Sequence, residues 1–104
     1  MDILSPRPLG RSGLTVSALG IGGGGSVSSN DVLYAVDRGI NVLFHSTDLH
    51  HMLYAPMAPA IRALCGRGSA RRADVVLALV TYVKEPEALE GVICDQVMAA
   101  LVAT

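Results

Sequence analysis

The sequence contains no tryptophan, one phenylalanine and three tyrosines, although 51% of its residues are hydrophobic. A core built from this chain must therefore consist of aliphatic side chains, and short continuous runs of them are typical of buried strands in α/β proteins. Charged residues make up only 16% of the chain, and the formal net charge is −1. Because this balance lacks the basic surplus of nucleic-acid-binding proteins, nucleic acid is not expected as a partner.

A cysteine framework and long apolar runs are also missing. The two cysteines, Cys65 and Cys94, both lie in helical patterns of apolar residues, so we expect two buried free thiols in a reducing compartment. The N-terminal segment has no basic stretch followed by an apolar one, and no run is long enough to span a bilayer. These features predict a cytoplasmic protein with no membrane contact.

The chain instead alternates strand and helix patterns over a single domain, residues 1–104. The predicted order is a hairpin around 10–13, a strand over 14–18, a helix from a cap at 28–30 to Gly39, a strand over 40–44, a helix from 58 to Gly66, a strand over 74–83 and a helix from Pro86. Right-handed crossovers turn this order into a three-stranded parallel sheet. Since the strand over 74–83 is apolar throughout, we expect it to be covered on both faces.

Four segments carry a family resemblance. RPLGRSGLTVSALGIGG (7–23) resembles the N-terminal hairpin and first barrel strand of the aldo/keto reductases, and AVDRGIN (35–41) is similar to the end of their first helix. RRADVVLA (71–78) and PEALEGVICDQVMAAL (86–101) resemble the third strand and third helix. The resemblance implies an α/β fold, namely an N-terminal hairpin plus three parallel β/α units of an eight-stranded TIM barrel. It also implies an NAD(P)H-dependent carbonyl oxidoreductase with NADP or NAD as cofactor.

Three units are an incomplete barrel. In this family the nicotinamide contacts come largely from later strands, so the resemblance implies a partial chain or subunit that is inactive by itself. The strand over 74–83 would be an open edge, and the barrel-facing side chains would be uncovered. We therefore expect self-association or a partner protein that completes the barrel. The alternative is a non-catalytic interaction subunit that keeps the half-barrel as a scaffold.

The family's catalytic positions are not reproduced. Its pattern after the second strand is roughly FFDTADxY, where this chain has VLFHSTDLHH. With one inserted residue, His45 stands in place of the catalytic aspartate and His50 in place of the tyrosine. The lysine that the family keeps after the third strand is replaced by Leu79 and Val80, and Lys84 follows four residues later.

The candidate catalytic residues are thus His45, Asp48, His50 and Tyr54. Tyr54 is the nearest tyrosine and Asp48 the nearest acid. Either histidine suits acid/base chemistry. Alternatively, His45 with Asp48 and one of His50 or His51 would form a zinc or iron site, which would make the chain a small metal-binding protein. The third interpretation is a solvated loop at the rim of the sheet.

The glycine run at 20–25 allows two interpretations. It satisfies G-x-G-x-x-G after a strand, which is the pattern of a dinucleotide-binding loop. However, residues 26–30 separate the last glycine from the predicted helix, whereas phosphate binding requires the helix to begin at the glycines. We favour a tight bend at which side chains would clash.

Overall fold

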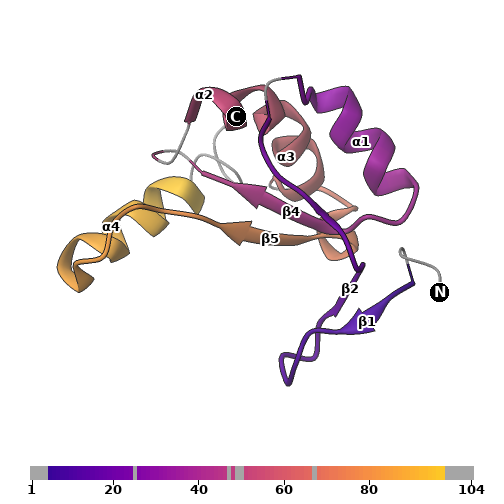
Figure 1. The fold of residues 1–104 in the computed structure, drawn as a ribbon, viewed down its shortest axis with the longest axis horizontal. Helices are drawn as coiled ribbons and strands as arrows, with labels where there is room; N and C mark the ends of the chain where they lie inside the picture. The colour runs from indigo at the N-terminus through magenta and orange to yellow at the C-terminus, as the bar shows by residue number, and fades with distance from the viewer. Residues whose placement is uncertain (1–4, 25, 47, 49–50, 67, 98–104) are drawn as a thin grey trace.

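A computed structural model describes residues 5–24, 26–46, 48, 51–66 and 68–97. Its elements alternate along the chain after an initial hairpin (Figure 1). They are β1 (Arg7–Pro8), β2 (Thr15–Val16), β3 (Gly20–Ile21), α1 (Ser29–Asp37), β4 (Val42–His45), α2 (His51–Tyr54), the 3-10 turn η1 (Ala55–Met57), α3 (Ala58–Cys65), the 3-10 turn η2 (Arg72–Asp74), β5 (Val76–Leu79) and α4 (Pro86–Val97).

The two sheets are an antiparallel pair, β1–β2, and a parallel sheet in the chain order β3–β4–β5. The predicted α/β class with a three-stranded parallel sheet is confirmed. The predicted strand over 14–18 is confirmed only for Thr15–Val16, which pairs with β1 in the hairpin, and its predicted place in the parallel sheet is wrong. Ser17 ends the strand: its hydroxyl donates to the Leu19 carbonyl at 2.6 Å, and its backbone N–H donates to the Asn41 side chain at 2.7 Å. The chain therefore enters the parallel sheet only at Gly20.

Asn41 joins the hairpin to the amino end of β4. Its side-chain nitrogen donates to the Thr15 carbonyl at 2.8 Å, and its backbone N–H donates to the Ser17 hydroxyl at 3.0 Å. The side-chain oxygen of Asn41 also accepts from the Ser17 N–H, so both ends of the amide are hydrogen-bonded. The hairpin is thereby fixed at the start of the sheet.

The first helix, α1, begins and ends as predicted. The Ser28 hydroxyl accepts from the Asp31 N–H at 3.2 Å, and the Asp31 carboxylate accepts from the Ser28 N–H at 2.8 Å, which is a capping box. Gly39 follows the helix with a φ of 107°, a conformation that favours glycine. The second predicted helix likewise matches α3, which ends before Gly66.

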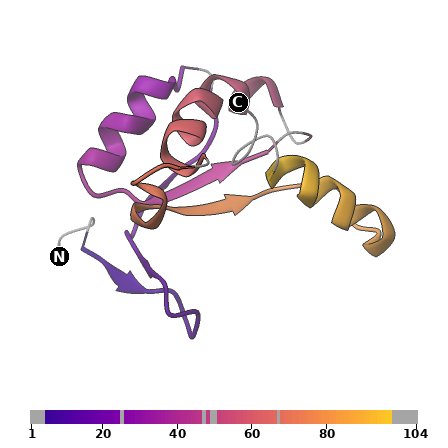
Figure 2. The same ribbon diagram turned by 180° about the vertical axis from the view of Figure 1, so that it is seen from behind.

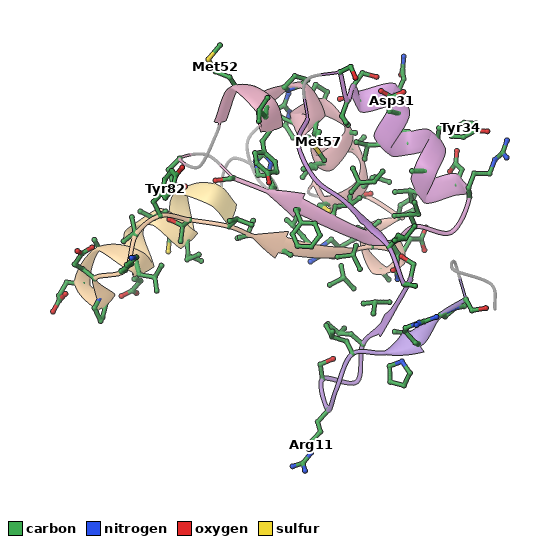
Figure 3. The ribbon with its side chains drawn as sticks, viewed as in Figure 1. Arg11, Asp31, Tyr34, Met52, Met57 and Tyr82 are labelled. Carbon is green, nitrogen blue, oxygen red and sulfur yellow. The ribbon has the colours of Figure 1, made fainter. Side chains whose placement is uncertain are left out.

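The helices α1 and α3 cover the same face of the parallel sheet (Figure 2). Leu43 in the middle of β4 is 0% exposed and lies at the centre of this layer. Met57, also fully buried, points from η1 into the same layer (Figure 3). The buried cluster contains no aromatic residue and comprises Val32, Val36, Leu43, Met57, Ala60, Ile61, Leu64, Cys65 and Val75.

The opposite face of the sheet is open within the described part of the chain. Phe44 lies on this face and is 37% exposed, and every residue of β5 is half-buried. The prediction that the strand over 74–83 is covered on both faces is therefore wrong, and the strand itself spans only residues 76–79. The cause is the placement of α4, which extends beyond the end of the sheet instead of across it (Figures 1 and 2).

The last helix, α4, begins at Pro86 as predicted. Cys94 on this helix is exposed, so its predicted burial is wrong, whereas Cys65 on α3 is buried as predicted, and both thiols are free. Among the described residues, no helix has the length and apolar character needed to cross a membrane.

Candidate functional site

The candidate residues follow the carboxyl ends of the three parallel strands, which lie at one edge of the sheet. The glycine bend follows β3, the stretch beginning at Ser46 follows β4, and the stretch beginning at Val80 follows β5. The Val80 N–H donates to the His45 carbonyl at 2.9 Å, which continues the β4–β5 pairing to the end of β4. Ligand sites of parallel α/β sheets lie at this edge.

His45 is the last residue of β4 and is only 4% exposed. Desolvation by burial, and secondarily the positive charge of Arg62, lowers the pKa of its imidazole below the ordinary 6.5. Its Nδ1 atom has no hydrogen-bond partner among the described residues. Burial therefore favours the neutral form of this imidazole at the sheet edge, and the Nδ1 atom is itself buried.

Tyr54 lies next to His45. The two rings meet edge to face, with centroids 6.4 Å apart and planes at 88°. The tyrosine hydroxyl lies beside Gly22, since a Cβ atom placed there would be 3.7 Å from the hydroxyl oxygen. Two of the four predicted site residues, one from a strand and one from a helix, are thus brought together at the glycine bend.

Close packing explains the glycine bend itself. A Cβ atom on Gly23 would lie 2.8 Å from the Leu53 carbonyl oxygen and 3.0 Å from Cγ of Tyr54. One on Gly20 would lie 2.9 Å from the Phe44 ring. These distances are too short for a side chain, so the glycines permit the chain to pass against α2 and β4. This geometry supports the interpretation as a tight bend.

Asp48 faces the loop after β5. Its carboxylate accepts from the Ser46 hydroxyl at 3.0 Å and from the Thr81 hydroxyl at 2.5 Å, and Thr81 in turn accepts from the Val83 N–H at 3.1 Å. Asp48 therefore ties the stretch after β4 to the stretch after β5. Sequence reasoning did not single out Thr81; its signal is a hydroxyl residue directly after the apolar run of the third strand.

The remaining predicted positions divide into two groups. His50 lies outside the described residues. His51 is the first residue of α2, so Tyr54 belongs to a helix and not to a loop. Over the described ranges, no group of three or more His, Cys, Asp or Glu side chains is arranged to hold a metal, and a metal site that includes His50 stays a prediction. Leu79 ends β5 half-buried, and Lys84 is exposed in the segment before α4.

Comparisons of the chain with protein-family models, with curated proteins and with solved structures gave no match. The resemblance to aldo/keto reductases therefore stays a prediction from the sequence segments, and the geometry of the site is the basis for any assignment of function.

Proposed function

We propose that this chain supplies the proton-donating residues of an aldo/keto reductase-like carbonyl oxidoreductase and acts within an assembly whose other members bind the nicotinamide. The pairing of His45 with Tyr54 at the carboxyl end of the sheet carries the proposal. A phenol hydroxyl is a suitable proton donor to a carbonyl oxygen, and a buried neutral imidazole is a suitable hydrogen-bonding group beside it. Tyr54 takes the proton-donor role and His45 the orienting role.

The arrangement of the layers is compatible with a barrel-like parent fold. Consecutive β/α units of a barrel place neighbouring strands in chain order and their helices on one face. The order β3–β4–β5, with α1 and α3 on the same face, agrees with this pattern. One βαβαβ half of a doubly wound sheet has the same arrangement, so the preference for a barrel comes from the resemblance of the sequence segments.

The nicotinamide cofactor that the family implies, NADP or NAD, does not fit the described residues. At the glycine bend, the backbone is packed against Leu53 and Tyr54. At the N-terminus of α1, the Asp31 carboxylate accepts from the Ser28 N–H and the Ser28 hydroxyl accepts from the Asp31 N–H, and the negative charge of Asp31 would repel a phosphate. The chain by itself is expected to bind neither NADPH nor NADH with micromolar affinity.

The proposal is tested by following NADPH and NADH oxidation with a panel of aldehydes and ketones, using the protein in its assembled state. Tyr54→Phe should lower kcat about 100-fold or more, because proton donation is lost. Tyr34→Phe is the matched control, since Tyr34 is exposed on α1 and its ring stacks under the Arg38 guanidinium. The absence of NAD(P)H-dependent carbonyl reduction, or an unchanged kcat in Tyr54→Phe, would contradict the proposal.

A second candidate function is a non-catalytic interaction subunit. The open sheet face favours it, as does the lack of a lysine at the end of β5, where Leu79 stands. This function predicts that Tyr54→Phe leaves the activity of any assembly unchanged, whereas Phe44→Glu prevents assembly. Measuring both variants separates the two functions.

A further inference from the structure

The open face of the parallel sheet is apolar. By the register of the strands, Val42 lies between Gly20 and Val76, and Phe44 lies beside Ala78. The Phe44 ring lies over Gly20, where a Cβ atom would be only 2.9 Å from the ring. Neither α1, α3 nor α4 lies across this face (Figures 1 and 2). An apolar sheet face of this kind needs a covering surface.

Opposite charges stand at the two ends of the open face. Arg11 is an exposed basic residue in the hairpin segment 5–16, which contains no acidic residue, whereas α4 contains Glu87 and Glu90 and no Lys or Arg. The hairpin lies at the amino ends of the strands, and α4 extends beyond their carboxyl ends (Figure 1). Arg11 points outward from the tip of the hairpin (Figure 3). Each end of the chain is therefore complementary in charge to the other end.

We propose that a second copy of this chain covers the open face, with the strands of the two sheets antiparallel across a two-fold axis. This orientation places the basic hairpin of each copy against the acidic α4 of the other. The parallel orientation would place hairpin against hairpin and α4 against α4, so like charges would meet. A two-fold interface requires one self-complementary patch, which the apolar centre and the oppositely charged ends provide. The proposal rests on the open face and does not depend on the proposed reductase activity.

Light scattering after size-exclusion chromatography tests the interface centre. The full chain should be a dimer at micromolar concentration. Phe44→Glu should raise the dimer dissociation constant at least about 100-fold, because it buries an unpaired charge. Tyr34→Glu, on the outer side of α1, is the matched control and should stay dimeric. Far-ultraviolet circular dichroism of both variants reports whether they remain folded.

Charge reversal tests the orientation independently of Phe44. Arg11→Glu in one preparation, and Glu87→Arg with Glu90→Arg in another, should each weaken the homodimer about tenfold at low salt, since like charges then face each other at both ends of the interface. Mixing the two preparations should restore dimers, because opposite charges meet at both ends of the mixed pair. High salt should remove these differences.

Three results would overturn the proposal. The first is a wild-type chain that stays monomeric at high concentration, which would leave the face to a different partner. The second is a dimer that Phe44→Glu, folded by circular dichroism, does not weaken. The third is a mixture of the two charge-reversed preparations that associates no better than either preparation does separately. Because the described residues of the chain do not fit a nicotinamide cofactor, the carbonyl reductase activity of this dimer does not bear on the interface, and the two proposals fail by different measurements.

Discussion

Replacing Gly23 with alanine is expected to push the glycine bend away from α2. The added Cβ atom would lie 2.8 Å from the Leu53 carbonyl oxygen, 2.9 Å from the Leu53 carbonyl carbon and 3.0 Å from Cγ of Tyr54. Two of these three atoms are backbone, so a side-chain rotation cannot relieve the contacts, and the bend and helix must separate.

The magnitude follows from two opposing effects. Overpacking of this kind costs about 1–3 kcal/mol. Alanine also lowers the conformational entropy of the unfolded chain, which raises the free energy of unfolding by about 0.4–1 kcal/mol. Gly23→Ala should therefore lower the free energy of unfolding by about 1 kcal/mol, and by no more than about 2.6 kcal/mol. Gly24→Ala is the matched control, because its Cβ atom would meet only Val27 Cγ2, at an ordinary 3.4 Å.

Urea unfolding followed by circular dichroism provides the assay, since the chain has no tryptophan for fluorescence. Gly23→Ala should unfold at a lower urea concentration than Gly24→Ala with a similar denaturant slope. If the two variants have equal midpoints, the bend does not pack against α2 as described, and the explanation of the glycine run by close packing is refuted.

Two further predictions concern stability. Because burial lowers the pKa of His45 from 6.5, the unfolded state binds its proton first as the pH falls, so stability should be complete above about pH 6.5 and decrease from there toward the folded-state pKa. As the pH falls over this range, the urea midpoint should fall less steeply for His45→Gln than for the wild type. If both midpoints depend equally on pH, the lowered pKa of His45 is contradicted. Ser28→Ala should cost about 1 kcal/mol through loss of the cap on α1. Ser26→Ala, an exposed position before the cap, should have no measurable effect in the same unfolding assay, and equal losses would refute the capping role.

The sequence predicts best those elements whose signals are local. The cap at Ser28, the stop at Gly39 and the proline at the start of α4 act within a few residues, and the helices begin and end accordingly. The end of β2 at Val16 depends on Ser17 contacting Asn41, 24 residues away. The alternation of apolar residues over 14–18 carries no information about that contact, so it predicts a longer strand than the structure has.

The site shows the same difference between local and distant determinants. The sequence identifies His45 and Tyr54 as candidates, but His45 is buried only in the folded chain, and its ring meets that of Tyr54 where α2 packs against the glycine bend. Likewise, the bond between Thr81 and Asp48 spans 33 residues. Chemistry-bearing residue types are visible in the sequence, whereas their partners are set by tertiary packing.

The central claim is that His45 and Tyr54 form one proton-handling site. The most direct measurement is the kcat/KM for carbonyl reduction by the assembled protein in His45→Gln, Tyr54→Phe and the double variant. If the two side chains act together, the double variant should be about as slow as Tyr54→Phe, so the two losses should not multiply. Losses that multiply independently, or single variants with wild-type kcat/KM, would contradict the claim.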